Sequence, residues 1–208
     1  MSREKHSVAP LVKEFYPEYY SLHEYPADQC VVFTKVDLPW GILGNFGRTS
    51  IIVNGVTFRT AEQLFQMMKF KEAEQLMDIY KSGGLFLKHK AKKWENQDKR
   101  RADWGSMVVD AMKMCIQLKY EQNEDFRNEL ERTKGMYIVE GQKKGPDTWG
   151  AKLTDDVYAG SNLMGRLLME LRDNGKLEYH LPDNALDFIE IIKRELDKSC
   201  EVKVPWLK

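Results

Sequence analysis

The dipeptide Asn54-Gly55 lies between two short runs rich in β-branched residues, "SIIV" and "VTFRT". Asn and Gly adopt the positive φ angles of a type I′ turn at little cost, so this pattern predicts a β-hairpin. Thr60 ends the second run, and Gln63 follows three residues later, a spacing typical of a capping box at a helix start. We expect that helix to run over about 61–82 and to stop at Gly83-Gly84.

Helical periodicity predicts further helices, whereas strands are few. Helices are expected near 98–122, 125–133, 163–174 and 184–198, and strands at 30–36 and 136–140. The segment "LFLKHKAKKWENQDKRRADW" is expected to form a short helix and a loop. The segment between the last strand and the helix at 163 is expected to be one long loop, and its length suggests a function. The fold class is therefore α+β and predominantly helical, with a small sheet that contains the hairpin.

A chain of 208 residues is long enough for one domain with terminal additions. We expect an N-terminal extension over 1–29, which packs on the domain through its aromatic residues. The single domain is expected over 30–175. A C-terminal extension over 176–208 is expected to place an amphipathic helix on that domain.

Charge and cysteine content exclude several classes of protein. The 32 basic residues balance 32 acidic ones, so no global field attracts the chain to nucleic acid or to a membrane. No run approaches the roughly 18 apolar residues of a membrane span. Cys30, Cys115 and Cys200 are far apart and are expected to be reduced thiols of a cytoplasmic protein. The four histidines are scattered, so neither a metal site nor a cofactor is expected.

The first candidate site lies on the helix that follows the hairpin. Glu62, Gln66 and Lys69 are spaced i, i+4, i+7 and share one face of that helix. Helical side chains lean toward the N-terminus, so the amine of Lys69 is expected to reach back toward Glu62. Large apolar neighbours such as Phe65 suggest that this face is partly buried. The alternative is a solvated face with a weak ion pair.

A second group follows the strand at 136–140. Glu140 ends this strand, and Asp147 and Trp149 lie in the loop beyond it. Two carboxylates beside an indole suit a site for a sugar or a flat base, because the indole stacks and the acids accept hydrogen bonds from hydroxyls. The alternative is two solvated acids and a core tryptophan.

Three further segments have weaker signals. Asn162 is a good N-cap, and the free N–H groups of the helix that it opens would suit a phosphate. Asn45 lies in the glycine-rich loop "WGILGNFG", where it either binds a ligand or holds the turn. The basic run over 88–101 is expected to be a solvated face, with phosphate binding as the alternative.

Six blocks in order resemble the NADAR family of N-glycosidases, also called YbiA-like. The blocks are "GNF" (44–46), "TAEQLFQMMKF" (60–70), "ADWGSMVVDAM" (102–112), "LKYEQNEDFRNELERT" (118–133), "YIVEGQKKGPDTWG" (137–150) and "GSNLMGRLLMELR" (160–172). The resemblance implies a helix-rich fold that hydrolyses N-glycosidic bonds to ribose. It implies as substrates the phosphoribosyl-bearing intermediates of early riboflavin biosynthesis or, alternatively, ADP-ribose on guanine.

The resemblance also implies the residues of the site. The implied catalytic residues are Glu62, Lys69 and Asp147, and the implied substrate-binding residues are Asn45, Phe46, Gln66, Trp104, Glu140, Trp149 and Asn162. A carboxylate beside the anomeric carbon would stabilise its positive charge or activate water, which is the role expected for Glu62. Lys69 would attack the same carbon and form an imine, or it would orient Glu62 or bind phosphate.

Asp147 would bind ribose hydroxyls or protonate the leaving base, and Trp149 or Trp104 would stack on that base. Two positions depart from the family pattern: Gln63 replaces a histidine, and Gly44 replaces a serine. The expected partner is a small phosphoribosyl or ADP-ribosyl molecule, with nucleic acid only as a modified substrate. The alternatives are a sensor that binds NAD or ADP-ribose without turnover, and a partner-binding domain that uses the C-terminal helix.

Overall fold

The computed structural model describes residues 7–144 and 148–201. Its α-helices are α1 (Ala9–Phe15), α2 (Ala61–Met67), α3 (Ala73–Tyr80), α4 (Leu85–Glu95), α5 (Val108–Gln122), α6 (Glu124–Glu131), α7 (Leu163–Asn174) and α8 (Phe188–Glu201). Its strands are β1 (His23–Pro26), β2 (Cys30–Phe33), β3 (Ile51–Val53), β4 (Val56–Phe58), β5 (Tyr137–Glu140), β6 (Lys152–Thr154) and β7 (Val157–Gly160). This is the α+β, predominantly helical fold that the sequence predicts.

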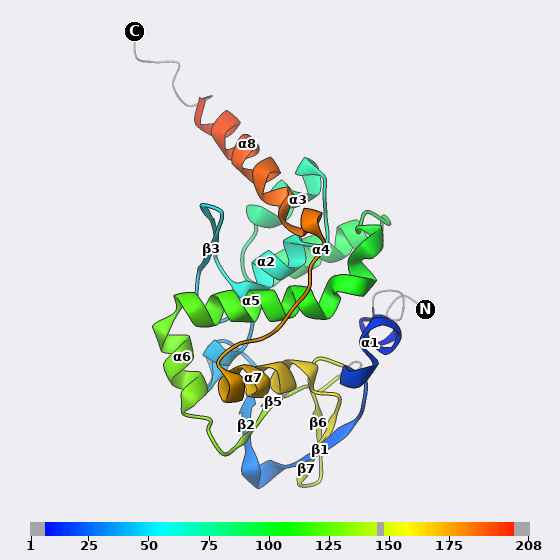
Figure 1. Ribbon diagram of the computed structural model, residues 1–208, viewed down its shortest axis with the longest axis vertical. Coiled ribbons are helices and arrows are strands. Elements are labelled where there is room, and N and C mark those ends of the chain that lie inside the picture. Colours follow the sequence, from blue (N-terminus) through cyan, green and yellow to red (C-terminus); the bar gives the residue numbers. More distant parts are fainter. Residues whose placement is uncertain (1–6, 145–147, 202–208) are drawn as a thin grey trace.

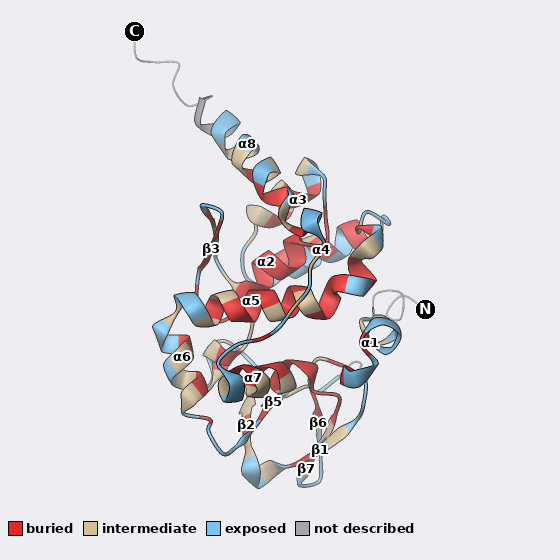
Figure 2. Ribbon diagram, in the orientation of Figure 1, coloured by how far each residue is buried: buried red, intermediate tan, exposed pale blue. Residues whose placement is uncertain are grey.

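Helix α5 lies across the middle of the molecule (Figure 1). On one side are α2, α3, α4 and α8, and on the other are α7 and the strands β1, β2, β5, β6 and β7. Both α2 and α7 pack against α5. Figure 2 shows α5 buried along most of its length, whereas α8 is exposed at Asp197 and Lys198. The core therefore forms on both sides of α5.

The strands form three small sheets rather than one. Strands β2 and β5 pair in parallel, with Phe33 opposite Glu140. Strand β7 pairs antiparallel with both β1 and β6. The N-terminal strand β1 therefore belongs to the same sheet as β6 and β7, which lie far from it in the sequence. The segment over 141–162, expected to be one long loop, contains β6 and β7, which corrects that prediction.

The hairpin and the helix start after it are confirmed. Strands β3 and β4 pair antiparallel, and Asn54 and Gly55 between them have φ angles of 47° and 81°. Both angles are positive, as a type I′ turn requires. The Thr60 hydroxyl accepts a hydrogen bond from the Gln63 N–H at 3.2 Å. The Gln63 side chain in turn accepts from the Arg59 N–H at 2.8 Å, one residue before the position that a capping box predicts.

Two predicted helices are shorter in the structure. The helix expected over 61–82 is divided into α2 and α3, because the chain turns inward after Met67 and the Lys69 carbonyl accepts from the Arg101 N–H at 2.8 Å. The Lys69 carbonyl thus accepts a hydrogen bond from a distant segment instead of one from the next turn of a continuous helix. The helix expected over 98–122 begins only at Val108, and a 3₁₀ segment over Ala102–Met107 precedes it.

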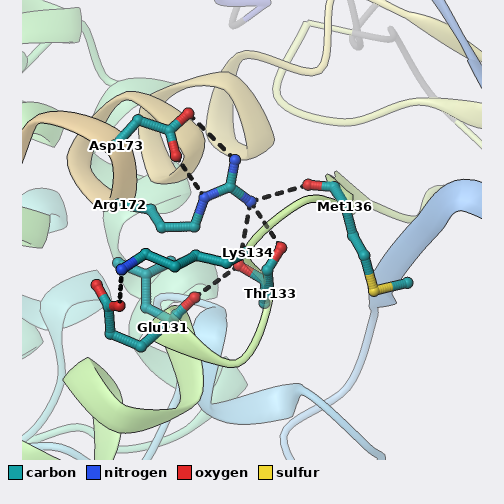
Figure 3. A network of polar contacts seen from close by, with 7 residues as sticks. Glu131, Thr133, Lys134, Met136, Arg172 and Asp173 are labelled. Atoms are coloured by element: carbon teal, nitrogen blue, oxygen red, sulfur yellow. Dashed lines mark hydrogen bonds and ion pairs between the residues drawn. The ribbon is translucent and has the colours of Figure 1, made fainter.

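A buried arginine connects α7 to the turn that leads into β5. Figure 3 shows Arg172 donating to the carbonyls of Thr133 and Met136, at 2.9 and 2.8 Å, while it pairs with Asp173 at 2.7 Å. The Arg172 side chain is only 7% exposed. Charged donors to backbone carbonyls are strong anchors, so the path of the chain into β5, which ends at Glu140, is fixed against α7.

The terminal segments pack on this core. Tyr16 donates from its hydroxyl to the Ser106 carbonyl at 2.7 Å. At the other end, Phe188 of α8 packs edge-on against Phe58 of β4, with ring centroids 6.2 Å apart. Within residues 7–144 and 148–201, no helix combines the length and the apolar character needed to cross a membrane.

Candidate active site

A cavity of about 940 Å³ opens between α2, α4, the loops that follow β2, and the end of β5. It brings together most of the residues that the sequence singles out. Those that line it are Asn45, Phe46, Glu62, Gln66, Lys69, Glu140 and Trp149. Its volume lies toward the upper end of the range for small-molecule sites, about 300–1,000 Å³.

Glu62 is buried in the wall of this cavity, with a side chain only 5% exposed. Its carboxylate accepts from the Gln66 amide at 2.8 Å and lies 3.3 Å from the Lys88 amine. Its backbone N–H donates to the Asn45 carbonyl at 3.0 Å, which attaches the start of α2 to the glycine-rich loop. One carboxylate oxygen is therefore held by two donors, and the side chain has a fixed orientation.

Lys69 also lines the cavity, but its ionic partner is not the expected one. Its amine pairs with Glu95 of α4 at 2.9 Å, rather than with Glu62, and both side chains are about one-tenth exposed. The reason is the end of α2 at Met67, beyond which Lys69 no longer follows the helical direction. Burial lowers the pKa of Lys69, while Glu95 and, more weakly, Glu62 oppose that change.

Two aromatic rings enclose the same amine. The Lys69 Nζ atom lies 5.6 Å from the ring centre of Phe65 and 5.7 Å from that of Trp104. Phe65 in turn contacts Trp149 edge-on, with centroids 5.7 Å apart. These rings exclude water from one side of the amine, and they place a lysine of lowered pKa at the cavity wall.

Helix α4 contributes more to the cavity than its basic sequence suggests. Lys88 and Lys92 of this run line the cavity. Both residues are exposed, as the expected solvated face requires. The Lys88 amine lies 5.0 Å from the ring centre of Phe46, and Glu62 and Glu140 raise its pKa. Lys90, by contrast, pairs with Asp78 on another side of α4. Sequence reasoning also missed Glu95, because neither its burial nor its partner follows from the run itself.

Glu140 ends β5 and is another carboxylate of the cavity. Burial raises its pKa from 4.5 to about 7, with Glu62 acting in the same direction and Lys88 opposing. A carboxyl group with this pKa is protonated in a large fraction of molecules near neutral pH. It can therefore donate a proton to a leaving group, as catalytic carboxylic acids in apolar sites do.

Asn162 does not line the cavity and instead supports it from behind. The residue is fully buried, and its amide accepts from the Glu140 N–H at 3.1 Å and donates to the Ile138 carbonyl at 2.8 Å. The first N–H groups of α7, from Leu163 and Met164, donate to carbonyls of the loop at 148–149. This helix start therefore does not offer the free N–H groups expected for a phosphate.

The remaining predicted residues are placed as follows. Trp104 is 1% exposed and lies behind Phe65 rather than in the cavity wall. Asp147 lies outside the described residues. The Asn45 amide donates to the Met112 sulfur at 3.0 Å, and its buried oxygen has no hydrogen-bond partner among the described residues.

Gln63, which replaces the histidine of the family pattern, has a structural role here. Its side chain is buried and donates to the Tyr80 carbonyl at 2.9 Å, so it joins α2 to the end of α3. It does not line the cavity. Gln63 therefore adds no group to the cavity.

A buried lysine that sequence reasoning missed holds the glycine-rich loop. The Lys119 amine donates to the carbonyls of Ile42 and Gly44, at 2.5 and 2.9 Å, and burial lowers its pKa to about 7. The loop carries Asn45 and Phe46 into the cavity, so Lys119 positions both. No group of three or more His, Cys, Asp or Glu that could hold a metal ion occurs in the described part of the chain.

An α+β fold whose cavity is lined by several carboxylates, a buried lysine and aromatic rings is typical of an enzyme that acts on a small molecule. The NADAR domain model matches residues 32–174, and the chain belongs to this family.

Curated relatives are similar at low identity. The chain is 27% identical over 174 residues to a riboflavin biosynthesis protein of Vibrio vulnificus, a match that covers 84% of this chain and 46% of that protein. The chain thus spans less than half of this relative. It is 27% identical over 152 residues to N-glycosidase YbiA of Escherichia coli, covering 73% of this chain and 91% of YbiA.

A solved structure shares the fold. The NMR structure of E. coli YbiA matches with a TM-score of 0.58 and 28% identity, covering 75% of this chain and 92% of that one.

Proposed function

We propose that this protein is an N-glycosidase that hydrolyses the bond between ribose phosphate and a base, as in early intermediates of riboflavin biosynthesis. The observation that carries the proposal is the placement of Glu62, Lys69 and Glu140 around one cavity. The names of the relatives, N-glycosidase YbiA and a riboflavin biosynthesis protein, support the same reaction and substrate class.

Glu140 is assigned the role of general acid. Breaking an N-glycosidic bond leaves an electron pair on the base nitrogen, and a proton supplied to that nitrogen or its conjugated ring lowers the barrier. A pKa of about 7 keeps the proton available near neutral pH. In this scheme Glu140 takes the role that the sequence analysis gave to Asp147 as one of two options, and Asp147 remains a candidate for the ribose hydroxyls.

Glu62 is assigned the role of stabilising positive charge on the anomeric carbon. Such charge develops as the base leaves, and a preoriented carboxylate in a site of low dielectric stabilises it strongly. The hydrogen bond from Gln66 and the ion pair with Lys88 hold the carboxylate in one orientation. Little reorganisation is then required at the moment of reaction.

Lys69 is assigned the role of nucleophile. Its amine attacks the anomeric carbon, the base departs with the electron pair of the broken bond, and the sugar opens to an imine that water hydrolyses. A lowered pKa favours this role because only the neutral amine has a free lone pair. If the reaction proceeds without a covalent intermediate, Lys69 instead stabilises the leaving group or orients Glu62.

The phosphate of the substrate is assigned to α4. Lys88 and Lys92 both line the cavity from this helix, and their amines suit a phosphate as point charges. This assignment replaces the start of α7, whose first N–H groups are occupied by carbonyls of the protein.

The test is mass spectrometry of the purified protein incubated with a phosphoribosylaminopyrimidine, with and without borohydride. Release of the free base and ribose phosphate is expected, together with a reduced sugar adduct on Lys69. The matched variant Glu62→Gln keeps the shape of the side chain and should release neither product at a comparable rate. Absence of release by the wild-type protein would contradict the proposal.

A second candidate substrate is ADP-ribose attached to guanine. The volume of about 940 Å³ favours it, because a phosphoribosylated pyrimidine fills only part of such a cavity. Parallel incubation with ADP-ribosylated guanosine separates the two substrates by their relative kcat/KM. Binding of ADP-ribose without turnover of either substrate would instead indicate a sensor.

A further inference from the structure

Two ion pairs connect the segment over 62–69 to α4 in a regular pattern. Glu62 pairs with Lys88, and Lys69 pairs with Glu95. Residues 62 and 69 are seven positions apart, and so are 88 and 95. The two pairs therefore form a ladder in which the acid and the base exchange sides from one rung to the next. Glu62 and Lys69, which both have assigned roles in the proposed reaction, therefore each have a partner of opposite charge on α4.

The second rung is the more deeply buried. The Lys69 and Glu95 side chains are 11% and 9% exposed, whereas Lys88 on the first rung is 49% exposed. Burying one charge of such a pair without the other is strongly unfavourable, so Glu95 constrains where the Lys69 amine lies. Both residues line the cavity, and Phe65 and Trp104 enclose the amine on another side.

We propose that Glu95 is a positioning residue that holds the Lys69 amine at the cavity wall and accepts its proton when that amine attacks the sugar. The inference rests on the proposed function, and it deepens it by naming the base that the lysine requires. No water or other base is needed for the transfer, because the Glu95 carboxylate lies 2.9 Å from the Lys69 amine.

The assigned step is balanced as follows. One proton passes from the Lys69 ammonium to Glu95, which leaves a neutral amine and a neutral carboxylic acid. The amine forms a bond to C1 of the ribosyl group while the C1–N bond to the base breaks. The electron pair of that bond goes to the base, which takes a proton from Glu140.

Hydrolysis then restores the enzyme. The new C1-bound ammonium gives one proton to the ring oxygen as the ring opens, which produces an iminium ion. Water adds to the iminium carbon, and the open sugar leaves as an aldehyde while Lys69 regains its ammonium form. The proton held by Glu95 returns through solvent to Glu140.

A purely electrostatic role for Glu95 and the proposed positioning role predict opposite effects on the rate of adduct formation when Glu95 is replaced. The charged groups that act on Lys69 are Glu95, Glu62 and Arg100, and Glu95 has the largest opposing effect on the pKa lowered by burial. Without its negative charge, the pKa of Lys69 would fall further and more neutral amine would be present at pH 7. Trapping by borohydride would then become faster. A positioning and proton-accepting role predicts that it becomes slower.

The experiment compares the full-length wild-type protein with Glu95→Gln, Glu95→Asp and Asp78→Asn, with phosphoribosylaminopyrimidine as substrate. Asp78→Asn is the matched control, because it removes the ion pair between Asp78 of α3 and Lys90 of α4, and neither residue lines the cavity. The readouts are the rate of base release, the rate of borohydride adduct formation on Lys69 from pH 5.5 to 9, and the thermal unfolding midpoint.

Glu95→Gln is expected to slow adduct formation at pH 7 at least tenfold, with Glu95→Asp intermediate and Asp78→Asn near wild type. An equal or faster rate in Glu95→Gln would overturn the inference. If Glu95→Gln does not fold, Glu95→Asp decides, and a wild-type rate there also overturns it. Base release by the wild-type protein without an adduct overturns the inference alone. Absence of any release overturns the proposed function and the inference together.

Discussion

Replacing Glu140 by glutamine tests the acid of the proposed site. Glutamine keeps the shape of the side chain but cannot give up a proton, so kcat is expected to fall by about 10²–10⁴, the usual contribution of a general acid. With a pKa of about 7, the wild-type group is about half protonated at pH 7 and about one-tenth protonated at pH 8. The wild-type rate should therefore fall about tenfold per pH unit above pH 7.5.

The assay measures base release by the two proteins from pH 5.5 to 9, with chromatography to quantify the free base. The wild-type profile is expected to have a descending limb near pH 7, and the residual activity of Glu140→Gln should lack this limb. A descending limb of the same midpoint in Glu140→Gln would refute the assignment, because another group would then supply the proton.

The same substitution has an expected effect on stability. The folded pKa of Glu140 lies above its ordinary value of 4.5, so the folded state binds the proton more tightly than the unfolded state does. The carboxylate then destabilises the fold progressively from about pH 4.5 to 7, by up to about 3 kcal/mol at about 1.4 kcal/mol per pH unit, before any reduction for partial exposure. Glu140→Gln should unfold at higher denaturant than wild type at pH 8, and the difference should shrink toward pH 4.

Three further predictions concern neighbouring residues. Glu62→Gln should lower kcat by about 10²–10³ without unfolding the protein, and near wild-type turnover would remove this carboxylate from the mechanism. Asn162→Ala should destabilise the fold by about 1–3 kcal/mol in chemical denaturation, because the Glu140 N–H and the Ile138 carbonyl lose their partner. Lys88→Met should raise KM for a phosphorylated substrate by about tenfold or more and leave KM for the matching nucleoside nearly unchanged, and equal changes in both would contradict phosphate binding by α4.

Those parts of the fold that depend on neighbouring residues could be predicted from the sequence. Asn54-Gly55 specifies its own turn, and Thr60 with Gln63 specifies a helix start, because each acts over a few residues. The early end of α2 could not be predicted in this way. It depends on the bond from the Arg101 N–H to the Lys69 carbonyl, which joins segments about thirty residues apart.

In the candidate site, too, contacts between nearby residues could be predicted from the sequence, whereas contacts between distant segments could not. Glu62 and Gln66 could be paired from their spacing because both lie on α2, and they are hydrogen-bonded in the structure. The partner of Lys69 could not be inferred, since Glu95 belongs to another helix and follows a run of basic residues that resembles a solvated face. Asn162 was singled out as a helix N-cap and by the family resemblance, but only the fold shows that it contacts the backbone on both sides of Val139 rather than the cavity.

The alternating ladder explains how a cavity can hold several charges and remain stable. Glu62, Lys69 and Glu95 are each buried, and an isolated buried charge would cost several kcal/mol. Because each acid on one segment faces a base on the other, every one of these charges is compensated before substrate binds. When the base leaves, the ribosyl group develops positive charge next to these compensated groups. The carboxylates stabilise that charge most at the transition state, where it is largest, and this difference between ground and transition state is what accelerates a reaction.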